Sequence, residues 1–136
     1  MNDNYLHSEI TSNIIAAFYA VYNKLGYGFL EKVYERCLLI ELGKLGHHPI
    51  AQHPINVHYE NHVVGHYIAD ILVDDKVIVE VKAADALSKE HEAQLTNYLK
   101  ATDIEVGLLV NFGKKAEFKR KVFSAQYKYH NLPPRT

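Results

Sequence analysis

Two acidic side chains and a lysine interrupt the most apolar part of the sequence. The segment DILVDDKVIVEVKAADAL begins at Asp70 and also contains Glu80 and Lys82. Because side chains alternate between the two faces of a β-strand, Glu80 and Lys82 share one face of the strand predicted at 77–83. A turn at residues 74–76 would bring Asp70 to the same edge of the sheet as Glu80. We therefore expect the three side chains to lie together.

This combination of side chains suits the chemistry of phosphate esters. Carboxylates gathered at one sheet edge collect hard divalent cations, since Mg²⁺ prefers oxygen ligands and keeps several waters beside one or two acids. Lys82 could compensate the negative charge, hold a nucleophilic water or stabilise charge on a phosphorus oxygen. A structural ion pair at a strand end, of little energetic consequence, is the alternative interpretation of the same residues.

Length and composition indicate a single globular domain. The 136 residues suffice for one sizeable core, and the apolar fraction of 48% and charged fraction of 23% are ordinary for a folded protein. We expect a domain over 1–136 whose last part, from about 124, is a flexible or peripheral tail. The single cysteine excludes an internal disulfide and favours the cytoplasm, and the sequence contains neither a secretory pattern nor a membrane-spanning run.

The net charge of −1 hides an uneven distribution. Residues 112–136 contain seven Lys or Arg side chains and one acid, so the remaining chain is acidic. A basic segment beside an acidic body suits a protein that binds a polyanion at one place and cations at another, although from charge alone a solvated surface segment is the simpler interpretation. The side chains expected to contact nucleic acid here are Lys114, Lys115, Lys119, Arg120 and Lys121.

Hydrophobic periodicity predicts an α/β fold. Helical spacing and strand-like runs alternate along the chain, with turn residues between them. The predicted elements are helices at 6–25, 30–45 and 86–101 and strands at 50–59, 63–73, 77–83, 106–110 and 118–123. The order α-α-β-β-β-α-β-β indicates a mixed β-sheet flanked by helices.

The acidic pair also carries a family resemblance. Asp70, followed after nine residues by Glu80-Val81-Lys82, resembles the D…(D/E)xK signature of the PD-(D/E)xK nuclease superfamily, with Ala69 in place of the usual proline. That superfamily has a restriction-endonuclease-like core in the order α-β-β-β-α-β. The resemblance therefore implies the same fold that the periodicity predicts.

Two further motifs strengthen the resemblance. The stretch from Gln94 to Tyr98 is similar to the QxxxY motif of the RecB-like and lambda-exonuclease-like branches. In GFLEKVY, Gly28, Glu31 and Tyr34 fit the GxxExxY pattern of a small bacterial family assigned to this superfamily. The resemblance runs from about residue 10 to residue 120.

The resemblance implies a site and a cofactor. Asp70 and Glu80 would be metal ligands, Lys82 the catalytic lysine, and Glu31 a helix-borne acid that completes or orients the metal site. Gln94 would act in catalysis by positioning the scissile phosphate or a site residue, and Tyr98 would contact nucleic acid. The implied cofactor is Mg²⁺ or Mn²⁺.

Two functions follow from these residues. The first is a metal-dependent nuclease that hydrolyses phosphodiester bonds in DNA, or in RNA. The second is a non-catalytic module that binds nucleic acid or protein and keeps the nuclease fold. A nuclease fold that has lost its activity commonly lacks one of the acids or the lysine. Asp70, Glu80 and Lys82 are all present here, which favours the enzyme. The expected partner is nucleic acid, DNA in preference to RNA, with no membrane; a homodimer is left open.

Overall fold

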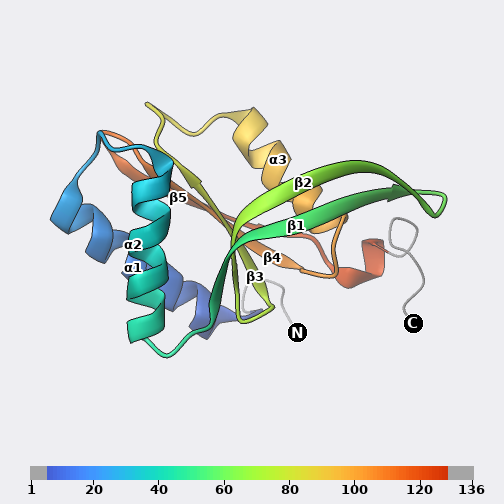
Figure 1. The fold of residues 1–136 in the computed structure, drawn as a ribbon, viewed down its shortest axis with the longest axis horizontal. Coiled ribbons are helices and arrows are strands. Elements are labelled where there is room, and N and C mark those ends of the chain that lie inside the picture. Colours follow the sequence, from blue (N-terminus) through green and yellow to red (C-terminus); the bar gives the residue numbers. More distant parts are fainter. Residues whose placement is uncertain (1–5, 129–136) are drawn as a thin grey trace.

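The computed structural model describes residues 6–128 and contains a five-stranded mixed sheet with helices on both faces (Figure 1). The elements are α1 (Ser8–Leu25), α2 (Glu31–Lys44), β1 (Pro49–Tyr59), β2 (His62–Val73), β3 (Val77–Lys82), α3 (Lys89–Lys100), β4 (Val106–Phe112), β5 (Ala116–Val122) and a short 3-10 helix at Ala125–Tyr127. This order confirms the predicted α/β fold, restriction-endonuclease-like in its arrangement.

The sheet follows chain order, β1-β2-β3-β4-β5. Neighbouring strands are antiparallel except β3 and β4, which are parallel and are joined by α3. A parallel pair needs such a crossover, because a short turn can only reverse the chain direction. The crossover places α3 on the face of the sheet opposite α1 and α2.

Each face of the sheet has its own apolar core. Helices α1 and α2 pack on one face, where the ring of Tyr34 stacks on Phe112 with 4.1 Å between centroids. On the other face, Leu95 and Leu99 of α3 pack against Ile78 and other buried side chains. Strands β3 and β4 are therefore covered on both sides, which explains their nearly continuous apolar sequences.

A capping box fixes the start of α3. The Ser88 hydroxyl accepts a hydrogen bond from the backbone N–H of His91, and the His91 ring nitrogen Nδ1 accepts one from the backbone N–H of Ser88, each at 3.1 Å. Together the two bonds satisfy donors that the first helical turn leaves free. His91 thus has a structural partner, and Gln94 and Tyr98 follow it in a fixed register.

Short turns close both hairpins, with residues 60–61 between β1 and β2 and residues 74–76 between β2 and β3. Glu60 and Asn61 between β1 and β2, and Asp74 and Asp75 between β2 and β3, all have positive φ, from 48° to 67°. Such turns match the right-handed twist of the flanking strands. They also hold non-glycine residues in a conformation that side chains disfavour.

The side chain of Asp74 connects the second turn to the helical layer. It accepts a hydrogen bond from the backbone N–H of His48 at 2.7 Å and pairs with the His47 ring at 2.6 Å. The other ring nitrogen of His47 lies 2.9 Å from the side-chain amide of Asn13 on α1. Asp74 therefore fixes the chain entering β1 against both β2 and α1.

Strand β2 stays beside β3 only briefly. The two strands pair through Ile71↔Val79, Leu72↔Ile78 and Val73↔Val77, whereas β1 and β2 pair over almost their whole lengths. The rest of this hairpin leaves the sheet as an arm, residues 53–69, that runs beside α3 (Figure 1). The place where β2 and β3 separate, formed by Asp70, Glu80 and Val81, is called the fork below.

The start of the predicted tail packs on the body of the protein. Lys128 is buried, and its ammonium group donates to the carbonyl of Ile104, while the backbone N–H of Ala125 donates to Glu105. The remaining tail, residues 129–136, lies outside the described residues. Within residues 6–128, no helix is long and apolar enough to cross a membrane.

The β2–β3 turn offers a matched pair of stability tests. In Asp75→Gly we expect the free energy of unfolding to rise by about 0.5 kcal/mol, since glycine relieves the positive φ and the Asp75 side chain has no hydrogen bond within residues 6–128. Asp74→Gly gains the same backbone relief but loses the contacts to His47 and His48, so it should lose about 1–2 kcal/mol. Denaturant unfolding measures both changes.

The deficit of Asp74→Gly should also depend on pH. Burial alone would raise the pKa of Asp74, but hydrogen bonds from His48 and His47 outweigh it and hold the pKa below its ordinary value. A depressed carboxyl pKa stabilises the fold above the ordinary value and loses this effect as pH falls through the depressed one. The free energies of unfolding of the two variants should therefore converge in acid. Equal losses in both at pH 7 would contradict this account of the turn.

Candidate active site at the strand fork

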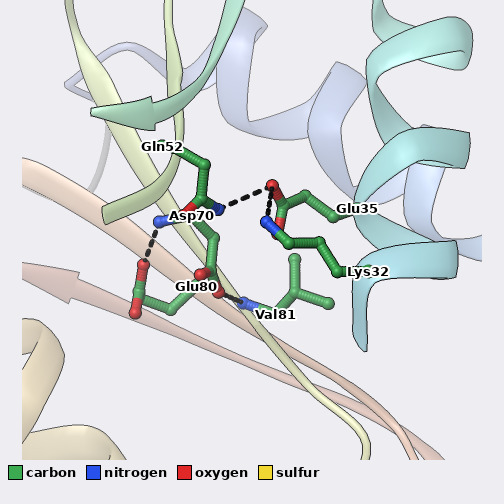
Figure 2. A network of polar contacts seen from close by, with 6 residues as sticks. All are labelled: Lys32, Glu35, Gln52, Asp70, Glu80 and Val81. Carbon is green, nitrogen blue, oxygen red and sulfur yellow. Dashed lines mark hydrogen bonds and ion pairs between the residues drawn. The ribbon is translucent and has the colours of Figure 1, made fainter. Parts of the chain in front are cut away.

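Side chains replace the backbone ladder at the fork. Beyond the last β2–β3 pair, Ile71↔Val79, the backbone N–H of Asp70 donates to Oε2 of Glu80 at 2.7 Å. In return the backbone N–H of Val81 donates to Oδ2 of Asp70 at 2.8 Å, as Figure 2 shows. Each carboxylate is thus bound to the strand opposite its own, and the structure brings Asp70 and Glu80 side by side.

Burial makes this pair electrostatically unfavourable. Glu80 is only 2% exposed, and burial together with the neighbouring charge of Asp70 raises its pKa to about 8. Burial and the charge of Glu35 also raise the pKa of Asp70, against a backbone hydrogen bond and the nearby Lys82. Ionising both acids would therefore concentrate more negative charge at the fork than Lys82 offsets. A bound cation would relieve it.

A third acid approaches the fork from α2. Glu35 is 4% exposed and accepts a hydrogen bond from the side-chain amide of Gln52 at 2.8 Å, with Lys32 at 3.6 Å. Gln52 lies in β1 with a positive φ of 57°, an irregular point in that strand. Figure 2 shows Asp70 between Glu80 and Glu35. The fork therefore has an acid on each of three elements.

The family resemblance implied Glu31, not Glu35, as the helix-borne acid. The structure places Glu31 in the exposed first turn of α2, beside a hollow of about 300 Å³ that is also lined by Asp85 and Lys114. Among residues 6–128, neither Glu31 nor Glu35 forms a group of three with Asp70 and Glu80 that could hold a metal ion. The available signal for Glu35 was its place on the apolar stripe of α2, three residues before Leu38.

The rest of the GxxExxY pattern builds the connection between α1 and α2. Gly28 has a φ of 113°, a conformation that side chains rarely adopt. The Tyr34 hydroxyl donates to the carbonyl of Gly26 at 2.7 Å and accepts from the backbone N–H of Phe29 at 3.2 Å. These residues hold the turn from which α2 reaches the fork.

Lys82 and the QxxxY residues meet on the α3 side. The Lys82 ammonium group donates to Oε1 of Gln94 at 3.1 Å. Tyr98 lies one helical turn further along α3, and burial with the charges of Glu80 and Asp70 raises its pKa to about 12. Gln94 therefore fixes the direction of Lys82, and Tyr98 lies within reach of the charge at the fork.

Asn111 holds the loop that follows Lys82, a role that sequence reasoning missed. Its side chain accepts from the backbone N–H of Ala84 at 2.9 Å and donates to the carbonyl of Ala84 at 3.0 Å. Gly113 makes this contact possible, since a Cβ there would lie 2.2 Å from the same carbonyl. A polar residue within the fully buried β4 was the available signal.

The predicted basic segment does not form one surface. Because side chains alternate along β5, Arg120 turns toward α1 and donates to the carbonyl of Leu6 at 2.7 Å, whereas Lys121 pairs with Glu92 on α3. The exposed lysines of the segment are Lys114 and Lys115, in the β4–β5 turn, and Lys119 on β5.

The donor set at the fork suits an open magnesium-type site. Within residues 6–128 no group of three or more His, Cys, Asp or Glu side chains could hold a metal ion. Mg²⁺ is usually held by one or two carboxylates, with waters and substrate phosphates as its other ligands. Asp70 and Glu80 are such a pair, so they fit a Mg²⁺ or Mn²⁺ ion. Water and substrate would complete the coordination of that ion.

Comparisons with known proteins identify the family of this chain and a related fold. The sequence model of the PD-(D/E)XK nuclease superfamily matches residues 8–121, from α1 into β5. The fold is similar to the crystal structure of SSO0001, with a TM-score of 0.52 and 20% sequence identity over 88% of this chain and 60% of that one. This chain thus spans less than two thirds of that protein. No curated protein matches the sequence. The chain belongs to the PD-(D/E)XK nuclease superfamily.

Proposed function

We propose that this protein is a nuclease that uses Mg²⁺ or Mn²⁺ to hydrolyse phosphodiester bonds of nucleic acid, DNA in preference to RNA. The observation that carries the proposal is the fork itself. There buried Glu80 and half-buried Asp70, both with raised pKa values, lie on adjacent strands, with Lys82 on the same strand as Glu80. Perturbed carboxyl groups of this kind are typical of functional sites.

Asp70 and Glu80 would hold the metal through the oxygens that face away from their backbone donors. Glu35, held by Gln52 on the far side of Asp70, would complete or orient the ligand set in the role that the family resemblance implied for Glu31. A bound Mg²⁺ or Mn²⁺ would supply a Lewis acid for the phosphoryl oxygens. The protein side of the site is a fixed pair of acids whose repulsion favours a cation.

Lys82 would stabilise the negative charge that develops on the phosphoryl oxygens during displacement. A positioned ammonium group is effective there because it is already oriented when the charge appears. Gln94 provides the orientation through its hydrogen bond to Lys82, so we assign it a positioning role. Exposed Lys114, Lys115 and Lys119 would contact the backbone, which recognises phosphate without selecting a sequence.

A non-catalytic nucleic-acid-binding module is the second candidate. The observation in its favour is that no group of three or more His, Cys, Asp or Glu side chains among the described residues could hold a metal ion. Retention of both acids and the lysine at the fork favours the enzyme. Cleavage and binding measured on the same preparations separate the two functions.

Lys82→Ala should lower the single-turnover cleavage rate by about 100-fold or more, with nucleic-acid affinity nearly unchanged. The reason is that its charge acts mainly in the transition state. Lys76→Ala is the matched control, because Lys76 is an exposed lysine in the turn that precedes β3. The substrates are labelled single-stranded, duplex and branched DNA and RNA, each with Mn²⁺ or with EDTA.

Asp70→Asn and Glu80→Gln should abolish metal-dependent cleavage in the same assay. If the wild-type protein binds Mn²⁺ and nucleic acid but cuts none of the substrates, the binding module replaces the enzyme. Activity that persists in Glu80→Gln at the wild-type level would instead identify a contaminating nuclease.

The stability of the metal-free protein should fall as pH rises from about 4.5 to about 8. In this range the folded protein keeps a proton on Glu80 that the unfolded chain has released, because burial and Asp70 raise the pKa of Glu80 to about 8. The groups that face Glu80 are Asp70, Glu35, Lys82 and Tyr98. Mn²⁺ should reverse the trend, since it binds the ionised carboxylates.

Glu80→Gln is the comparison that isolates this effect. Glutamine keeps the size of the side chain and stays uncharged, so the variant should be the more stable protein at pH 8 in EDTA and should gain little from Mn²⁺. Melting temperatures at pH 6 and pH 8, with Mn²⁺ and with EDTA, test both expectations. A wild-type protein whose stability is insensitive to Mn²⁺ at pH 8 would contradict the metal site.

A further inference from the structure

A groove of about 670 Å³ runs between the arm and α3. The arm contributes Val57, Val64 and Tyr67 to its walls, and α3 contributes Ala93, Asn97 and further residues. This volume is in the range of pockets that bind small organic groups. Its existence depends on the fork, because β2 must leave β3 before the arm and the helix can face each other.

The groove leads directly to the fork. Gln94 and Tyr98 line it, and both also face the candidate site: Gln94 accepts the hydrogen bond from Lys82, and the charges of Glu80 and Asp70 act on Tyr98. A chain lying in the groove would therefore pass its backbone beside the paired acids. The groove and the candidate site are parts of one surface.

The walls have the chemistry that receives a nucleobase. The rings of Tyr67 and Tyr98 lie 5.8 Å apart and tilted by 50°, with Tyr67 half exposed toward solvent. Apolar Val57 and Val64 continue this wall, and the amides of Gln94 and Asn97 can hydrogen-bond a base edge. Aromatic side chains of this kind stack on unpaired bases, whatever the base.

The charge of the groove argues against a duplex. Its lining contains one lysine, Lys100, and one acid, Glu90, so it offers no row of cations for two phosphate backbones. A paired base presents only its edge, whereas an unpaired base exposes a face that the half-exposed ring of Tyr67 could cover, with the buried ring of Tyr98 packed behind it. We infer that the groove binds unpaired nucleotides, so that the substrate of the proposed nuclease is single-stranded nucleic acid or a single-stranded segment of a larger one.

This inference rests on the proposed function for its role in cleavage, but its test needs no cleavage. Fluorescence anisotropy in EDTA, on the full-length protein, compares a labelled 12-nucleotide DNA strand, the RNA of the same sequence and the blunt DNA duplex. The single strands should bind at least tenfold more tightly than the duplex. A difference in affinity between the DNA strand and the RNA strand identifies the sugar that the groove prefers. Equal affinity for the single strand and the duplex would overturn the inference.

Tyr67→Ser tests the aromatic wall, with Tyr59→Ser as the matched control. Both tyrosines are exposed residues of the same hairpin, 51% and 66%, but only Tyr67 lines the groove. Stacking is worth roughly 1–3 kcal/mol per base, so Tyr67→Ser should weaken single-strand binding by about 5- to 150-fold, and Tyr59→Ser by less than twofold. Ala93→Glu, at an exposed position of α3 that tolerates any good helix former, should weaken it comparably by blocking the groove.

A 2-aminopurine base in the strand gives a direct readout, since stacking quenches its fluorescence. Quenching in the wild-type protein and in Tyr59→Ser, but not in Tyr67→Ser, is the expected result. Equal binding losses in the two tyrosine variants, or none in Tyr67→Ser and Ala93→Glu, would overturn the inference. Single-strand binding without cleavage in any divalent ion would refute the nuclease alone, and cleavage without these binding effects would refute the groove alone.

Discussion

The exchange of hydrogen bonds between Asp70 and Glu80 is the contact on which the rest of this structure depends. Where a continuous sheet would have two backbones paired, each carboxylate accepts the N–H of the other strand. Because side chains accept hydrogen bonds from these donors, β2 can leave β3 without leaving buried N–H groups unpaired. The departing hairpin becomes the arm, and the arm and α3 enclose the groove. At this one place, side-chain hydrogen bonds replace the backbone hydrogen bonds between β2 and β3. This replacement yields both the acidic pair and the surface that leads to it.

The same contact places electrostatic strain in the fold. Buried Glu80 meets half-buried Asp70, with Glu35 on α2 and Lys82 nearby, and the raised pKa of Glu80 expresses the cost of ionising it there. Proteins commonly break the rules of stable packing at sites where function requires it. The surrounding structure holds the fork in place: the two cores fix the strands, Gln52 fixes Glu35, and Asn111 fixes the loop after Lys82. This support keeps the acids together in the absence of a cation.

Most of the fold could be predicted because hydrophobic periodicity and turn residues are local properties of the sequence. The order of the elements follows from hydrophobic periodicity and turn residues, and the nearness of Asp70 and Glu80 follows from the short turn at residues 74–76. Strict alternation fails in β2, however, since Ala69 and Leu72 both face α3. Glu35 and Asn111 were missed because their partners, Gln52 and Ala84, are distant in sequence. Arg120 and Lys121, read from composition as one basic segment, are divided by strand alternation between two faces.

Crystals grown with Mn²⁺ and measured at a wavelength where manganese scatters anomalously test the central claim most directly. We expect one strong anomalous peak at the fork, about 2.0–2.2 Å from carboxylate oxygens of both Asp70 and Glu80, that is absent from Glu80→Gln crystals. The rest of the coordination sphere should be water, with Glu35 bound directly or through one of those waters. A protein saturated with Mn²⁺ whose anomalous density lies elsewhere, with the fork unchanged, would contradict the account.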